Sequence, residues 1–100
     1  MKTPRSLTLG ELLAGAAETP AALASRMVEG VTSDSRVAGR GMAFFAVPGV
    51  KVDGAAFGVQ ALQKGAVAVV SETPGPAGLE GWIVTANVRA ALAQAASRMH

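Results

Sequence analysis

Apolar residues recur along most of the chain at the spacings of helices and strands. Near the start, leucines repeat at helical spacing from Leu9 onward. Thr8 precedes this run and Glu11 follows Thr8 by three positions, which is the pattern of a capping box at a helix N-terminus. We therefore expect a helix over residues 9–17, and residues 21–27 fit either one further helical turn or a loop.

Four short apolar runs have the length and composition of strands. Residues 27–32 carry valines around a glycine, and residues 42–47 are apolar throughout, as in a strand that is buried on both faces. Residues 66–70 form a second run of the buried type, and residues 82–85 form a shorter one. Where a helix is predicted between two strands, the strands should pair in parallel through a right-handed crossover.

Two longer helices are predicted around these strands. Asp53 has the residue type of an N-cap for a helix that reaches Lys64, and Gly65 follows as a usual helix stop. Asn87 is the corresponding cap for a helix over residues 88–99, whose apolar residues form one stripe. The alternation predicts an α/β fold: a small three-layer domain with a mixed, largely parallel sheet and about three helices.

The composition is that of one folded unit, so residues 1–100 are expected to form a single domain. Half of the residues are apolar and 16% are charged, which suits one hydrophobic core. The formal net charge is +2, and the basic residues are scattered, which argues against nucleic-acid binding. No run approaches the ~20 apolar residues that span a bilayer, and the first residues do not resemble a secretory signal. The absence of cysteine fits a cytoplasmic protein.

Few residues in this chain could carry out catalysis. The sequence has no Gly-x-x-x-x-Gly-Lys-Ser/Thr loop for ATP phosphates, and its only histidine, His100, stands at the last position. A Ser-His-acid triad therefore lacks an internal histidine, and Asp34 and Asp53 alone are too few for a metal site. We expect no catalytic residue, metal or cofactor in this chain, and no ATP hydrolysis or amide formation by the chain alone.

Polar residues gather where the first predicted strand ends. Ser33 and Ser35 flank Asp34 in the loop that follows this strand. Their hydroxyls can donate to phosphate oxygens together with the N–H groups of the turn, but the same residues also fit an ordinary turn that satisfies its own backbone. Arg36 can pair either with a diphosphate or with Asp34.

A second candidate segment follows the strand over residues 42–47. Val50, Lys51 and Val52 lie between this strand and the next predicted helix, so their backbone groups have no ladder to complete. They can present N–H and carbonyl groups to the edge of a planar base, or they can form a plain loop. Both segments follow predicted strands, and open α/β sheets bind ligands at such ends.

The order of these motifs resembles the first domain of the Mur ligases of bacterial cell-wall synthesis. The resemblance rests on the leucine-rich opening helix and on five further segments: residues 32–36, 41–49, 53–54, 65–72 and 88–92. Several motifs in a fixed order are more specific than any one of them. Within the family, the pattern is most similar to the ligases that add the third amino acid to UDP-N-acetylmuramoyl-L-alanyl-D-glutamate.

The resemblance implies a non-catalytic domain that holds the UDP end of the UDP-N-acetylmuramoyl-dipeptide substrate. It implies that Ser33, Ser35, Val50, Lys51 and Val52 contact the UDP-muramoyl group. The parent enzyme would be an ATP-dependent ligase that uses ATP and Mg²⁺ and adds L-lysine or meso-diaminopimelate. The central ATPase domain and the C-terminal domain of such a ligase are absent from this chain and would be its partners in peptidoglycan synthesis, cell shape and cell division.

Three residues depart from the family pattern. Arg40 stands where proline is frequent, Met42 where an acidic residue is frequent, and Ala55 where a bulky polar residue or histidine is common. A ligand contact through that last side chain does not carry over. Two alternatives stay open: the sibling ligase that adds D-alanyl-D-alanine, which an assay with each amino donor would separate, and a stand-alone interaction module, which continuation into a Gly-Thr-Asn-Gly-Lys-Thr motif would exclude.

Overall fold

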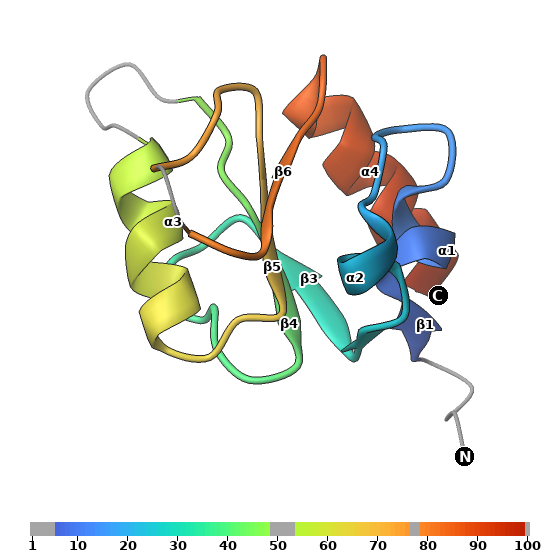
Figure 1. Cartoon of the computed structure of the whole chain (residues 1–100), viewed down its shortest axis with the longest axis horizontal. Coiled ribbons are helices and arrows are strands. Elements are labelled where there is room, and N and C mark those ends of the chain that lie inside the picture. Colours follow the sequence, from blue (N-terminus) through green and yellow to red (C-terminus); the bar gives the residue numbers. More distant parts are fainter. Residues whose placement is uncertain (1–5, 49–53, 77–78, 100) are drawn as a thin grey trace.

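The computed structural model describes residues 6–48, 54–76 and 79–99, which alternate between strands and helices (Figure 1). In chain order, the elements are β1 (Leu7–Thr8), α1 (Leu9–Leu13), α2 (Ala21–Ala24), β2 (Met27–Val28), β3 (Gly30–Thr32), β4 (Met42–Phe45), α3 (Gly54–Gln63), β5 (Ala68–Ser71), β6 (Trp82–Val84) and α4 (Val88–Met99). The predicted α/β class is confirmed. The segment that the sequence left open between a helical turn and a loop forms the short helix α2.

Four of the strands form one parallel sheet in the order β3-β4-β5-β6. The register places Val31 beside Ala43, Ala43 beside Ala68, and Val69 beside Trp82. Antiparallel pairing is confined to β1 and β2, which form a separate two-stranded sheet. Because all strands of the larger sheet run in the same direction, they end at one side of it, which we call the carboxyl edge.

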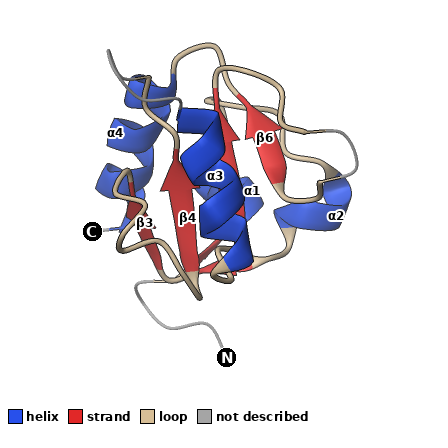
Figure 2. Cartoon of the chain, turned by 90° about the vertical axis from the view of Figure 1, so that its left-hand side faces the viewer, coloured by secondary structure: helices blue, strands red, loops and turns tan. Residues whose placement is uncertain are grey.

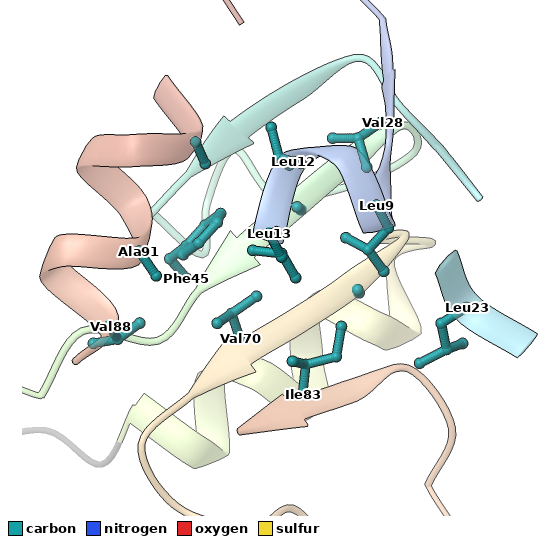
Figure 3. Packing of buried hydrophobic residues seen from close by; sticks show 13 residues of the cluster. Leu9, Leu12, Leu13, Leu23, Val28, Phe45, Val70, Ile83, Val88 and Ala91 are labelled. Carbon is teal, nitrogen blue, oxygen red and sulfur yellow. The ribbon is translucent and has the colours of Figure 1, made fainter. Parts of the chain in front are cut away.

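Helices cover both faces of the parallel sheet and make three layers. α3 lies on one face, and α1 and α4 lie on the other (Figure 1, Figure 2). Adjacent residues of a strand point to opposite faces, so Phe44 packs in a cluster with Ala38 and Ala61, whereas Phe45 packs in a cluster with Ala91. Figure 3 shows Phe45 pointing toward Ala91 of α4. Both phenylalanines are buried, and the predicted strand with two buried faces is confirmed.

Three of the predicted signals at helix ends are observed in the structure. Thr8 and Glu11 form the capping box: the Glu11 N–H donates to Thr8 Oγ1 at 3.2 Å, and the Thr8 N–H donates to Glu11 Oε1 at 2.9 Å. At the start of α4, Asn87 Oδ1 accepts a hydrogen bond from the Ala90 N–H at 3.0 Å. Gly65 follows α3 with a φ of 100°, a left-handed conformation that glycine adopts without the clash of a Cβ.

The first helix ends at Leu13 and not at the predicted residue 17. Gly15 has a φ of 85°, and the N–H of Ala17 turns back to the carbonyl oxygen of Leu13 at 3.1 Å. Arg98 of α4 supplies a donor for the carbonyl groups that remain, with Nη1 2.9 Å from the oxygen of Ala14. The helix can stop early because a side chain from another element satisfies its last carbonyl groups.

The strand predicted over residues 27–32 is two strands, β2 and β3, which belong to different sheets. The break falls at Glu29, whose N–H donates to the carbonyl oxygen of Gly41 at 2.7 Å. The N–H of Gly30 donates to the same oxygen at 3.3 Å, so the chain changes sheet at this point. The other strand limits differ from the predicted ones by at most two residues.

Candidate functional site

The loops that follow the four parallel strands begin at the carboxyl edge of the sheet, and the loop that contains Ser33 and Ser35 is one of them. Ser33 directly follows β3, Pro48 lies beyond the end of β4, Glu72 follows β5, and Thr85 follows β6. In open α/β sheets the carboxyl ends of the strands are where ligands bind, because the loops there diverge and leave backbone groups unpaired. The position of the predicted Ser33 to Arg36 site at this edge follows from the parallel order of the strands.

Asp34 is the centre of the loop after β3. Its N–H donates to Thr32 Oγ1 at 3.0 Å, and its Oδ1 accepts from the Arg36 N–H at 2.9 Å. The Arg36 side chain adds two hydrogen bonds, from Nε to Oδ1 at 3.0 Å and from Nη2 to Oδ2 at 2.9 Å. The guanidinium therefore binds the carboxylate through two hydrogen bonds, which is the strong bidentate geometry for this ion pair. We call this bidentate pair the fork.

The same loop is attached to the body of the domain at two further places. The carbonyl oxygen of Asp34 accepts from the N–H groups of Val37 at 3.0 Å and Ala38 at 3.2 Å, which winds residues 34–38 into a turn. Ala38 is buried in the cluster on the α3 side of the sheet. Lys64, just beyond α3, donates from Nζ to the carbonyl oxygen of Ser35 at 3.0 Å. The loop is thus held by a buried side chain and by a lysine from another element.

The two serines remain available to a ligand. Ser33 is exposed and Ser35 is half-buried, and neither hydroxyl makes a hydrogen bond to any part of the chain that the structure describes. Thr32, Asp34 and Arg36 satisfy the turn instead. The structure therefore separates two roles that the sequence left combined: a self-satisfied turn, and a pair of hydroxyls beside it that can donate to an oxygen-rich group.

The charge of the loop is balanced within it. Hydrogen bonds from the Arg36 side chain and from its backbone N–H hold the pKa of the Asp34 carboxyl below its ordinary value of 3.8. The hydrogen bonds to Asp34 and its negative charge in turn raise the pKa of the Arg36 guanidinium. Of the two pairings that the sequence allows for Arg36, the one with Asp34 is the one observed.

The second predicted segment cannot be placed. Val50, Lys51 and Val52 lie outside the described residues, as does the predicted cap Asp53. The chain is described up to Pro48, which lies beyond the end of β4 on the carboxyl side of the sheet. A contact of these three residues with a ligand stays a prediction.

Two side chains near this edge are not among those that the sequence pattern singles out. Glu72 Oε2 accepts from the Val88 N–H at 2.9 Å, which joins the end of β5 to the start of α4. Arg89 donates from Nη2 to the carbonyl oxygen of Pro48 at 3.2 Å, which joins α4 to the chain leaving β4. Their positions were a usable signal, because a residue after a parallel strand and a residue in the first turn of the next helix meet at the same edge.

A cavity of about 220 Å³ lies between the turn after α1 and the first turns of α4. Its lining residues are Gly15, Ala16, Thr85, Ala86, Asn87, Ala90, Ala91 and Gln94. Thr85 Oγ1 donates to the Ala16 oxygen at 2.8 Å, and Gln94 Nε2 donates to the Ala14 oxygen at 3.0 Å. These bonds join the turn after α1 to Thr85 and to α4, and neither Ser33 nor Ser35 lines the cavity.

The described ranges contain neither a cluster of metal-binding side chains nor a membrane-spanning helix. No group of three or more histidine, cysteine, aspartate or glutamate side chains comes together there in a way that could hold a metal ion. None of the helices there has both the length and the apolar character that a membrane span requires.

The family model described as "Mur ligase family, catalytic domain" matches residues 27–100. The chain therefore belongs to the Mur ligase family. Among curated relatives, the UDP-N-acetylmuramoyl-L-alanyl-D-glutamate–2,6-diaminopimelate ligase of Solibacter usitatus is 43% identical over 95 residues, which are 90% of this chain and 19% of the relative. The family resemblance predicted from the motifs is confirmed, and the chain spans about a fifth of the length of such relatives.

Solved structures of the same family share the fold. A UDP-N-acetylmuramoyl-L-alanyl-D-glutamate–2,6-diaminopimelate ligase superposes with a TM-score of 0.75 at 26% identity, over 94% of this chain and 19% of that chain. The UDP-N-acetylmuramoylalanyl-D-glutamyl-2,6-diaminopimelate–D-alanyl-D-alanyl ligase of Acinetobacter baumannii superposes with a TM-score of 0.69 at 26% identity, over 89% of this chain and 20% of that chain. Both kinds of ligase therefore contain a domain of this shape.

Proposed function

We propose that this chain is the UDP-binding domain of a ligase that adds 2,6-diaminopimelate to UDP-N-acetylmuramoyl-L-alanyl-D-glutamate in peptidoglycan synthesis. The observation that carries the proposal is the 43% identity, over 90% of this chain, to a relative that bears the name of this ligase. Further bacterial relatives of the same name match shorter stretches at 39% to 50% identity. The proposal includes a cytoplasmic location and the roles in cell shape and division expected of such an enzyme.

The chemistry of the carboxyl edge supports a binding role for the domain. Ser33 and Ser35 would donate their hydroxyl hydrogens to the diphosphate oxygens, together with N–H groups of the turn. Val50, Lys51 and Val52 would contact the UDP-muramoyl group through their backbone. Neither contact involves bond making or breaking, so this domain would hold the nucleotide end of the substrate and take no part in the reaction itself.

A remote binding domain still contributes to the rate of the parent reaction. Binding energy from a part of the substrate that does not react can position the reacting carboxylate and offset the entropy lost on association. ATP-dependent amide formation would take place in the parts of the parent enzyme that this chain lacks. The acidic residues of the described ranges do not form a donor set for Mg²⁺, so no step with ATP or Mg²⁺ is assigned to them.

The alternative with support of its own is the ligase that adds D-alanyl-D-alanine. A ligase of that name has a domain of the same fold at a TM-score of 0.69, against 0.75 for the diaminopimelate ligase. The sequence identity is 26% for both, so the fold alone does not separate the two activities. The curated relatives favour diaminopimelate.

An assay of the complete ligase that contains this chain tests the proposal. The enzyme is incubated with ATP, Mg²⁺ and UDP-N-acetylmuramoyl-L-alanyl-D-glutamate, and meso-diaminopimelate and L-lysine are compared as amino donors. A parallel reaction offers the tripeptide product with D-alanyl-D-alanine. We expect amide formation with diaminopimelate. Activity only in the reaction with D-alanyl-D-alanine would overturn the assignment.

The chain by itself is proposed to be inactive. Its sequence contains no phosphate-binding Gly-Lys loop, and the parent activity is expected to need the absent domains. Phosphate release from ATP is measured through successive purification steps. Turnover that persists and scales with the amount of this chain would contradict the division of roles between domains.

A further inference from the structure

We propose that Asp34 and Arg36 act as a positioning pair that holds Ser33 and Ser35 in the conformation that binds the ligand. Arg36 is then not the partner of the diphosphate. This inference rests on the proposed function, because it concerns the same binding loop. It goes further by dividing the loop into residues that touch the ligand and residues that only shape the loop.

Every polar group of Asp34 already has a partner inside the domain. Its N–H donates to Thr32 Oγ1, and its carbonyl oxygen accepts from Val37 and Ala38. Both carboxylate oxygens accept hydrogen bonds from Arg36, at 2.9 to 3.0 Å. Ser33 and Ser35 are the immediate neighbours of Asp34, so a residue fixed at all these points also fixes the backbone on which the two hydroxyls stand.

Electrostatics also favour a guanidinium that stays on Asp34. If the whole guanidinium turned to the ligand, it would give up the fork and leave the Asp34 carboxylate next to an anion with only the backbone N–H of Arg36 as a partner. Two negative groups repel each other, whereas the paired side chains of Asp34 and Arg36 have no net charge. Arg36 therefore serves the site best by neutralising Asp34 while the hydroxyls and turn N–H groups bind.

Exposure indicates that the pair acts on the loop more than on the fold. The Arg36 side chain is 88% exposed and that of Asp34 is 37% exposed. Ion pairs in contact with water contribute little to global stability. A change in this pair should therefore leave the melting temperature close to that of the parent, and should appear in the order of the loop and in its affinity for the ligand.

Four variants of the 100-residue chain separate positioning from direct binding: Asp34→Asn, Arg36→Gln, Arg36→Lys and the double variant that combines Asp34→Asn with Arg36→Gln. Arg40→Gln is the matched control, since it removes an exposed arginine from the same loop. Backbone NMR relaxation of Ser33 and Ser35 without ligand reports loop order. Calorimetric titration with UDP reports affinity, and circular dichroism reports the fold.

We expect Asp34→Asn and Arg36→Gln each to lower the backbone order of both serines. Each variant should also weaken UDP binding about tenfold, which corresponds to the loss of one hydrogen bond from a serine hydroxyl to a charged phosphate. The double variant should lose no more than either single one, because the pair acts as a unit. Arg36→Lys should not restore binding, since lysine keeps the charge but lacks the fork. Arg40→Gln should resemble the parent in both measurements.

Two results would overturn the positioning role. The first is unchanged order of Ser33 and Ser35 in Asp34→Asn, with or without ligand. The second is Asp34→Asn that binds UDP as tightly as the parent, or more tightly, while Arg36→Gln binds weakly, because a released Arg36 would then be the phosphate contact. A parent chain that does not bind UDP would instead refute the proposed function, and the loop order without ligand would still decide the positioning role.

Discussion

The carboxylate of Glu72 accepts a hydrogen bond from the backbone N–H of Val88, with 2.9 Å between Oε2 and the nitrogen. Glu72 directly follows β5, and Val88 is the first residue of α4. The first N–H groups of a helix have no partner within it, so a carboxylate from a neighbouring strand replaces the missing acceptor. Together with the Asn87 cap, this bond fixes the start of α4 at the carboxyl edge.

Replacing Glu72 by alanine should therefore weaken the domain. We expect a loss of about 0.5–2 kcal/mol in the free energy of unfolding, the range for removing an N-terminal helix cap. Urea denaturation followed by circular dichroism measures this loss. Glu80→Ala is the control, since Glu80 is an exposed glutamate outside the helices and strands. Equal stability of the two variants would show that the bond between Glu72 and Val88 contributes nothing.

Phe44 and Phe45 should each be essential to the core. The side chains are 2% and 0% exposed and lie in separate clusters on the two faces of the sheet. Phe44→Ala and Phe45→Ala should each cost about 3–5 kcal/mol, because each leaves a cavity that its cluster cannot fill. Val84→Ala, at a strand position that is 47% exposed, should melt close to the parent. Near-parent melting of both phenylalanine variants would refute the buried strand β4.

Gly75 has no room for a side chain. A Cβ at this position would overlap the indole of Trp82, whose Nε1 donates to the carbonyl oxygen of Thr73 at 2.9 Å. Gly75→Ala should lower stability by about 1–3 kcal/mol and shift the tryptophan emission, since the ring must move. Among the described residues, a Cβ at Gly39 would meet only the Lys64 oxygen, at 3.7 Å, so Gly39→Ala is the control. Unchanged melting and emission of Gly75→Ala would contradict the packing of the indole.

The Asp34 carboxylate in the loop after β3 should stay ionised to a lower pH than an ordinary aspartate. Hydrogen bonds from Arg36 lower the pKa of Asp34 below 3.8 in the folded chain. A carboxyl with a lowered pKa stabilises the folded form above its unfolded pKa, and this contribution is lost as the pH falls through the folded pKa. We expect an NMR titration of the Asp34 carboxyl carbon to show a midpoint below 3.8, and Arg36→Gln to move it upward. A parent midpoint at or above 3.8 would contradict the fork.

The sequence predicted those hydrogen bonds at helix ends whose two residues lie close together in the chain. The capping box of Thr8 and Glu11 spans three residues, and the Asn87 cap has the same reach. The early end of α1 could not be predicted in this way, because Arg98 reaches its carbonyl groups from 84 residues away. The break between β2 and β3 likewise depends on the distant carbonyl of Gly41.

The candidate site could likewise be predicted from the sequence only in part. The positions of Ser33 and Ser35 at a strand end follow from the order of strands and helices. The spacing of Asp34 and Arg36 fits either an internal pair or a diphosphate contact, and the folded geometry shows the internal pair. Glu72 was missed although the order of the elements places it, after β5, at the same edge as Val88 at the start of α4.

Ser35→Ala tests the predicted contact of one hydroxyl with the ligand. We expect UDP affinity to fall by ~1.5–3 kcal/mol if the hydroxyl donates to a phosphate oxygen, the range for a hydrogen bond to a charged group. The melting temperature should change little, since the side chain is outside both buried clusters. Ser33→Ala should weaken UDP binding less than Ser35→Ala does if Ser33 contacts the ligand through backbone atoms.

The most direct test of a UDP site at the carboxyl edge is an NMR titration of the isotope-labelled chain with UDP. We expect the amide signals of Ser33, Ser35 and residues 50–52 to move together along one binding curve. The affinity should be weak, because association costs translational and rotational freedom and the domains that hold the peptide end are missing. Saturation with UDP that moves only signals elsewhere in the chain, or no movement at any concentration, would contradict the site.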